Sequence, residues 1–358
     1  MSKKIIRYCW PEFYRNSWIW NFSNCYINEL KKIWYNIEDR RIKTNNNILR
    51  LIKQFLINPF KVILSERKVK KIFWDEWMLL YTLFPFFPYK TSTFIIHDIR
   101  DISMTTKKMN FMERCYFYFW KVAQNNIKKL EQIITPSEFT KNKIIKHYWV
   151  DWNKIHVIYS PLDLWLYKIF DDINKKDFLK KNWIETDKKI LLNVWSEESR
   201  KNIITILKTM RELDEYIFIK IWKPIIKQNR ESHLKFIKDN KLDNKVYFID
   251  FVETNEDLVK FYNIADIFVF PSLFEWFWRP PIEAQACWCP VISSIKWGLK
   301  EVIWDSAVIL KDPEDKNELL WKIASMDEIK NKIIKMGLKN VDRFSLGNNI
   351  SKWNNLFT

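Results

Sequence analysis

Glycine is nearly absent from this sequence, with 3 residues in a chain of 358. At the average usage of about 7%, a chain of this length would hold about 25 glycines. Tryptophan departs in the opposite direction, with 20 residues. The two counts together approach the usual number of glycines. Positions at which other proteins have glycine are therefore candidates for the excess tryptophans.

Cysteine and long hydrophobic runs are also scarce. The scattered, odd set of cysteines excludes a disulfide framework and favours a reducing cytoplasm. The C-x-C pair near residue 288 lacks a second pair, so two core thiols are favoured over a metal site. The most apolar stretch, residues 78–88, is too short and too rich in proline to span a bilayer. We expect a cytoplasmic protein, soluble or peripheral at the inner face of the membrane. The cysteines are Cys9, Cys25, Cys115, Cys287 and Cys289.

The charge is positive but dispersed. Sixty Lys and Arg against 43 Asp and Glu give a net charge of +17, with no run of more than two basic residues. A nucleic-acid-binding protein would concentrate these charges, so no nucleic-acid partner is expected. That alternative ranks last, and it predicts binding to DNA that weakens steeply with salt. A weak attraction to anionic membrane surfaces is expected instead.

Short β-branched runs alternate with segments of helical period along the whole chain, which is typical of parallel α/β layers. The pattern starts again after a charged stretch, so we predict an α/β fold of two doubly wound Rossmann-like domains that face a central crevice. The predicted division is a first domain at 1–170, a linker at 171–188, a second domain at 189–340, and a helix at 341–358 packing back on the first domain. The strands predicted for the second half are 189–194, 216–221, 246–251, 267–270, 291–293 and 307–310.

The most informative segment is residues 271–292. A strand is predicted to end just before it, and a helix to begin at Pro280 or Pro281, because proline suits the first helical turn. Glu275 then lies on the loop and Glu283 about one turn into the helix. The helix has to end before the next strand, where a left-handed residue, normally glycine, is wanted. Trp288 stands at that place.

This segment resembles the E-x(7)-E region of the group 1 glycosyltransferases, which use nucleotide sugars, retain anomeric configuration and have the GT-B fold. The pattern of that family reads E-G-F-G-x-P-x-x-E-A-x-A-x-G-x-P-V-I. Each glycine of the pattern is tryptophan here, at Trp276, Trp278 and Trp288, and the other fixed positions match. The same replacement recurs in segments similar to other motifs of the family. Those tryptophans are Trp18, Trp20, Trp34, Trp195, Trp297 and Trp304.

A replacement of one amino acid by one other indicates a codon, such as TGA, that means glycine in the source and is read as tryptophan. A tryptophan cannot serve where a glycine has positive φ or lets the backbone approach a diphosphate. The alternative is a truly tryptophan-rich protein with stacking platforms, whose aromatic residues would gather on one surface. Trp10, Trp120, Trp321 and Trp353 are not assigned to either reading.

The resemblance implies that the domain at 1–170 binds the acceptor and the domain at 189–340 binds the nucleotide sugar. It also implies roles for single residues. Lys201 would contact the diphosphate with Arg200 beside it, and Glu283 would bind the ribose hydroxyls. Glu275 would contact the transferred sugar, and His97 at the end of a strand would touch the sugar or the acceptor. These two are the candidate catalytic residues. The candidate donor-binding residues are Trp18, Trp20, Arg200, Lys201, Trp276, Phe277, Trp278, Arg279 and Glu283.

The function implied is transfer of a hexose from a nucleoside-diphosphate sugar to a glycan or lipid-linked acceptor, with retention, in cell-surface polysaccharide assembly. The sequence variants weakly favour mannose. No cofactor and no metal are expected, because fixed cations and amides would stabilise the leaving phosphate. The alternative is a catalytically inactive sugar-nucleotide or glycan-binding protein of the same fold.

Overall fold

The chain forms two units, each built on one parallel sheet. The computed structural model describes residues 5–9, 36–39, 70–74, 90, 92–97, 125–275 and 279–357. By its contacts, the first unit comprises residues 1–161 and 349–358, and the second comprises residues 162–348. Each unit is described here by itself. Of the candidate donor-binding residues, Trp18, Trp20, Trp276, Phe277 and Trp278 lie outside the described residues, as do Trp10, Trp34, Trp120, Cys25 and Cys115.

The sheet of the first unit has the order β2-β1-β3-β4-β5-β6, and all its neighbouring strands are parallel. Helix α6 (Glu138–Tyr148) follows β5 and starts at Ser137, whose Oγ accepts a hydrogen bond from the Thr140 amide. The end of the last helix, α15 (Leu346–Phe357), also belongs to this unit. The strands are β1 Ile5–Cys9, β2 Asn36–Asp39, β3 Lys70–Trp74, β4 Ser92–Ile95, β5 Gln132–Thr135 and β6 Ile155–Val157.

The sheet of the second unit has the order β12-β11-β10-β7-β8-β9 and is also parallel. Its strands are β7 Lys189–Val194, β8 Tyr216–Ile221, β9 Val246–Ile249, β10 Ile267–Phe270, β11 Val291–Ser294 and β12 Val308–Leu310. Its α-helices are α7 Lys175–Lys181, α8 Ile203–Met210, α9 Lys227–Asp239, α10 Asn255–Ile264, α11 Pro280–Ala286, α12 Leu299–Ile303, α13 Lys316–Ala324 and α14 Met326–Val341.

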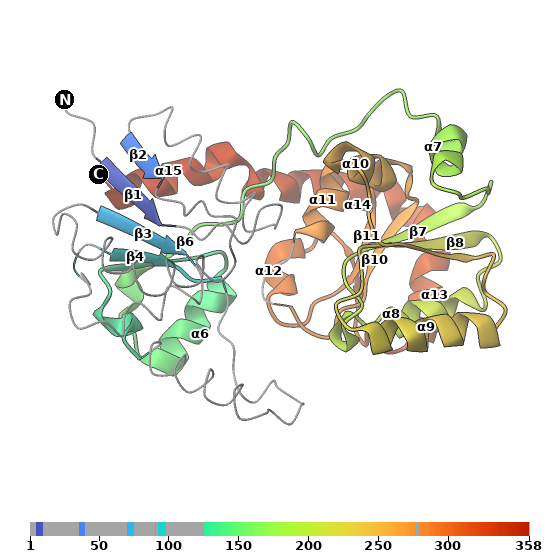
Figure 1. Cartoon of the computed structure of the whole chain (residues 1–358), viewed down its shortest axis with the longest axis horizontal. Helices are drawn as coiled ribbons and strands as arrows, with labels where there is room; N and C mark the ends of the chain where they lie inside the picture. The colour runs from blue at the N-terminus through green and yellow to red at the C-terminus, as the bar shows by residue number, and fades with distance from the viewer. Residues whose placement is uncertain are drawn as a thin grey trace, which may run out of the picture. The chain divides into compact units, whose positions relative to one another are not determined.

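Helices cover both faces of the second sheet. Figure 1 shows α8, α9 and α13 on one face and α10, α11 and α14 on the other. Because both faces are covered, the central strands are mostly apolar, as expected for a parallel sheet, with Asn193 in β7 and Lys220 in β8 as buried exceptions. Strands β8 and β10 are buried at every position. In the described part of the chain, no helix is long and apolar enough to cross a membrane.

The expected pair of doubly wound α/β units is confirmed. Each strand predicted for the second half overlaps an observed strand. The charged stretch 171–188, expected to be a linker, is grouped with the second unit. It contains α7, which is held there because Phe178 packs against Phe261, with ring centroids 4.8 Å apart.

Candidate active site

The site is built on the carboxyl ends of two neighbouring strands, β7 and β10. After β7 the chain makes a short loop and a 3-10 turn, Ser199–Lys201, before α8 begins. After β10 it continues into the loop that carries Glu275. The two loops are joined by a hydrogen bond from the Leu273 amide to the Arg200 carbonyl, 2.8 Å. Loops at the carboxyl ends of parallel strands are where doubly wound folds bind ligands.

A buried carboxylate meets two cations at this edge. Glu275 is 1% exposed, and its Oε1 accepts a hydrogen bond from Lys201 Nζ at 2.5 Å. Its Oε2 accepts one from Arg200 NH1 at 2.6 Å. Ser272 Oγ donates a third, at 2.8 Å to Oε1. Three of the residues expected at the donor site, on two loops, are thus brought together in one cluster.

Lys201 is the most buried cation of the cluster, with 1% of its surface exposed. Burial lowers the pKa of its ammonium to about 7, although the charge of Glu275 acts in the other direction. Burial also opposes the charge on Arg200, but Glu275 and Glu198 together raise the pKa of its guanidinium. The site therefore holds one permanent cation and one cation that can lose its proton near neutral pH.

The second expected glutamate, Glu283, lies in α11 in a buried polar group. Arg279 Nε is 3.3 Å from its Oε1, and the Tyr262 hydroxyl donates to its Oε2 at 3.0 Å. Tyr167 lies next to this group, with its ring edge-on to that of Tyr262 and the centroids 6.4 Å apart. Burial raises the pKa of Glu283, and the charge of Arg279 followed by the two tyrosines limits that rise. Arg279 thus has a visible partner, Glu283, one helical turn along. The expected contact of Glu283 with ribose stays a prediction.

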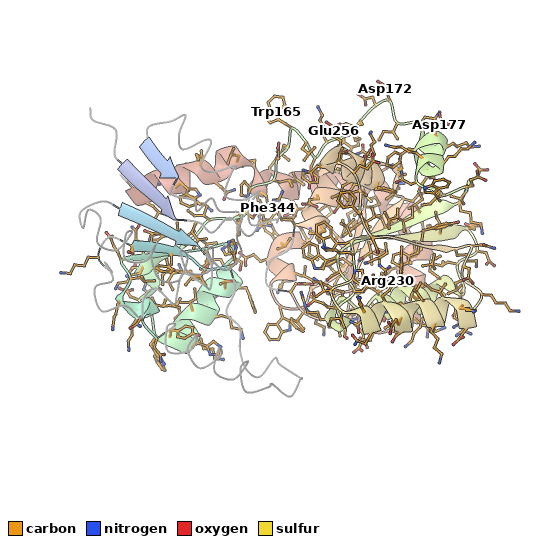
Figure 2. All side chains as sticks on the ribbon, viewed as in Figure 1. Trp165, Asp172, Asp177, Arg230, Glu256 and Phe344 are labelled. Carbon is orange, nitrogen blue, oxygen red and sulfur yellow. The ribbon has the colours of Figure 1, made fainter. Side chains whose placement is uncertain are left out.

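Behind the β7 loop lies a cluster that the sequence analysis missed. Glu197 is fully buried and accepts hydrogen bonds from Lys220 Nζ at 2.6 Å and from Arg230 NH2 at 2.6 Å and Nε at 2.9 Å. His233 Nδ1 lies 3.4 Å from its Oε2. Figure 2 labels Arg230 on α9. Burial pushes the pKa of Glu197 up, but the bonds from His233, Arg230 and Lys220 together lower it to about 2. The available signal in the sequence was Lys220, the one charged residue in the otherwise apolar run Tyr216–Ile221.

His97 belongs to the first unit, two residues after the end of β4. Its carbonyl accepts a hydrogen bond from Thr140 Oγ1 at 3.2 Å. Burial lowers the pKa of its imidazole to about 3, so the ring is neutral at physiological pH. Its expected contact with sugar or acceptor stays a prediction.

The C-x-C pair lies at the end of α11 and before β11. Cys287 and Cys289 are both buried, and burial raises the pKa of both thiols. Within the residues that the structure describes, no group of three or more His, Cys, Asp or Glu is arranged to hold a metal ion.

Comparison with known proteins gives a family and a fold. Residues 174–340 match the family model described as "Glycosyl transferases group 1". The O-antigen chain mannosyltransferase RfbU of Salmonella typhimurium is 28% identical over 270 residues, which is 74% of this chain and 64% of that protein. The serotype-specific mannosyltransferase WbdA of Escherichia coli is 26% identical over 242 residues, 65% of this chain and 28% of WbdA. The matches span less than two thirds of these relatives.

Solved structures match over the whole chain. A glycosyltransferase from Rickettsia africae superimposes with a TM-score of 0.73 at 17% identity, covering 100% of this chain and 98% of its own. The Anabaena protein HepE in complex with UDP gives a TM-score of 0.74 at 15% identity, with 99% of both chains covered. At these identities the likeness establishes the fold, which is the expected GT-B fold.

Proposed function

Because the chain belongs, through residues 174–340, to the group 1 glycosyltransferases, we propose that it transfers a hexose from a nucleoside-diphosphate sugar to a glycan or lipid-linked acceptor. The observation that carries this proposal is the buried cluster in which Lys201 and Arg200 from one loop face Glu275 from the next. Two cations at the carboxyl edge of a parallel sheet suit the diphosphate of such a donor.

The cluster suits departure of a nucleoside diphosphate. Breaking the bond from the sugar to phosphate leaves negative charge on the phosphate and an oxocarbenium-like sugar. Fixed cations in a site of low dielectric stabilise that charge without reorganisation. Lys201 and Arg200 would supply them, so the proposal needs no metal and no cofactor. Glu275 holds both cations in place before the donor arrives and would then face the sugar.

Retention of anomeric configuration is part of the proposal. The acceptor hydroxyl would attack from the face that the phosphate leaves, and the leaving phosphate would take the proton of the hydroxyl. The neutral imidazole of His97 would contact the sugar or the acceptor. This scheme requires Lys201 to keep its charge during the step.

The donor sugar and the setting are proposed from the relatives. RfbU and WbdA are named mannosyltransferases, and RfbU acts on an O-antigen chain. We therefore take GDP-mannose as the first donor to test and cell-surface polysaccharide assembly as the setting. The scattered cysteines support a cytoplasmic protein, and the net charge of +17 supports weak contact with the anionic inner face of the membrane.

The test is a donor screen followed by a transfer assay. Sugar nucleotides are screened by thermal shift, because a ligand that binds the native state raises the Tm. The donor that binds is then assayed for nucleoside diphosphate release with lipid-linked acceptors. Glu275→Gln should reduce kcat by about 100-fold or more, the cost of losing one preorganised electrostatic contact. A kcat for Glu275→Gln close to that of the parent protein would contradict the assignment.

A second candidate function is that of a sugar-nucleotide or glycan-binding protein without catalysis. The supporting observation is the ring of Trp195, whose centroid lies 5.0 Å from Lys201 Nζ and so covers the cation. In that case the donor screen would give a thermal shift while the transfer assay and nucleotide release stayed at background.

A further inference from the structure

Six tryptophans have left-handed backbone conformations, which residues with a Cβ atom rarely adopt. Among the described residues that are not glycine, only Asn202 and Lys241 share this property. None of the glycines has positive φ. Glycine, the residue best suited to positive φ, is thus not found with it here, whereas tryptophan, one of the bulkiest residues, is. The six are Trp149 (φ 54°), Trp183 (60°), Trp222 (114°), Trp288 (58°), Trp297 (60°) and Trp304 (46°).

Two of them close helices in the Schellman motif, where the left-handed position is usually glycine. After α7, the Trp183 amide donates to the Lys180 carbonyl and the next amide donates to Leu179, both at 3.0 Å. After α11, the Trp288 amide donates to Gln285 at 3.1 Å and the next amide donates to Ala284 at 2.9 Å. The hydrogen bonds need the left-handed turn but make no use of an indole.

Two more end helices in a simpler way. The Trp149 amide donates to the Ile145 carbonyl at the end of α6, 3.0 Å. The Trp304 amide donates to the Lys300 carbonyl at the end of α12, 2.9 Å. Trp304 combines φ 46° with ψ −117°. That combination lies in the mirror-image β region, which glycine enters readily and other residues do not.

Burial does not compensate for these conformations. Trp183 is 92% exposed, Trp149 is 88% exposed, and even Trp222, the most covered of the six, is 39% exposed. A side chain exposed to water gains little free energy from burial, so it offsets little of the backbone strain. Trp353 is the opposite case, because it lies inside helix α15 with 2% of its surface exposed.

We propose that the native protein carries glycine at positions 149, 183, 222, 288, 297 and 304, and tryptophan at position 353. Three of these positions, 149, 183 and 222, lie outside every motif of the family resemblance, so backbone geometry alone assigns them. Backbone geometry thus identifies at each position whether the native residue is glycine or tryptophan. The total numbers of glycines and tryptophans cannot make this distinction.

The assignment has a consequence for the candidate site that rests on the proposed function. Trp222, after β8, stacks on Trp195, with centroids 5.7 Å apart and planes 10° apart. Trp195 in turn lies over Lys201. Glycine at 222 removes one half of this stack, so the ring at 195 loses the partner that holds it over the cation.

The decisive experiment reads the residues from native protein. Protein purified from the cells that naturally express the gene is digested, and tandem mass spectra are collected for peptides that cover 183, 222, 288 and 353. Glycine at the first three and tryptophan at 353 is the expected result. Tryptophan at 183, 222 or 288 would overturn the proposal, and glycine at 353 would overturn its second half.

Recombinant protein with the printed sequence tests the physical argument. Trp183→Gly and Trp288→Gly should each raise the Tm by about 2 °C or more, because the strain of a left-handed residue is relieved. Lys241→Gly is the matched control, since Lys241 ends α9 in the same motif, and it should give a similar rise. Trp321→Gly inside α13 should lower the Tm. A lower Tm for both Trp183→Gly and Trp288→Gly would contradict the geometry.

Nucleotide binding is a separate readout. If mass spectra give glycine but GDP and UDP fail to bind the native protein, the proposed function fails and the glycine assignment stands. If nucleotides bind a protein that has tryptophan at these positions, the assignment fails and the function stands.

Discussion

Lys201 combines nearly complete burial with a charge that the proposed chemistry needs. Its ammonium is shielded from water and lies 2.5 Å from the Glu275 carboxylate. The carboxylate raises the pKa of the ammonium, but burial has the larger effect and lowers it to about 7. A diphosphate would add negative charge beside it and raise that pKa. Donor binding and protonation of Lys201 are therefore linked.

This linkage predicts a pH dependence of nucleotide binding. Above pH 7 the free protein loses the Lys201 proton, so binding of GDP must restore it. The Kd for GDP should rise by up to about tenfold per pH unit between pH 7 and pH 9. Calorimetry at pH 8 in two buffers of different ionisation enthalpy should show uptake of up to one proton.

Lys201→Arg is the control for this prediction. A guanidinium keeps its charge throughout this pH range, although it is not equivalent to an ammonium in shape. The variant should bind GDP more weakly at pH 7 but with little further change up to pH 9. The same pH slope in both proteins would show that another group takes up the proton.

At the scale of elements, Glu197 ties three segments together. It follows β7, receives Lys220 from β8, and receives Arg230 and His233 from α9. It also precedes the turn that carries Arg200 and Lys201. Removing one partner from such a buried group leaves uncompensated charge. The cluster therefore fixes the base of the loop that forms the candidate site.

We expect Glu197→Gln to lower the free energy of unfolding by about 3 kcal/mol at pH 7, since Lys220 and Arg230 lose their partner. In the parent protein the pKa of Glu197 is about 2, below its ordinary value. Its stabilising contribution is therefore complete above pH 4.5 and is lost as the pH falls toward 2. Urea unfolding at pH 7 and at pH 3 should show that the variant lacks this part of the acid sensitivity.

Asp250→Asn is the matched control. Asp250 binds the same Arg230 at 2.6 Å, but its side chain is 56% exposed. An exposed pair contributes little, so the change should cost less than about 1 kcal/mol. Equal losses in the two variants would mean that burial of Glu197 is not the source of its effect.

The sequence predicted most accurately the strands that are buried on both faces. Strands 189–194, 216–221 and 267–270 were predicted with the observed bounds, because a strand buried on both faces is a short apolar run. Strand β2, Asn36–Asp39, was not predicted, since it is short and mostly polar. Lys201 and Glu275 were found by resemblance. The Glu197 cluster was missed because its four members are separated by up to 36 residues and meet only in the folded chain.

At the scale of the whole molecule, the net charge of +17 leads to the last prediction. Each basic residue near an anionic lipid surface contributes about 1 kcal/mol, but dispersed charges bring only a few to the surface at once. Binding should therefore be weak and purely electrostatic. The protein should cosediment with vesicles that contain anionic lipid and should be released as salt rises from about 0.1 M to 1 M, where the screening length falls from about 10 Å to 3 Å. Vesicles of neutral phosphatidylcholine should bind none of it. Binding to neutral vesicles, or binding that persists at high salt, would instead require an apolar contact and would contradict this electrostatic mechanism.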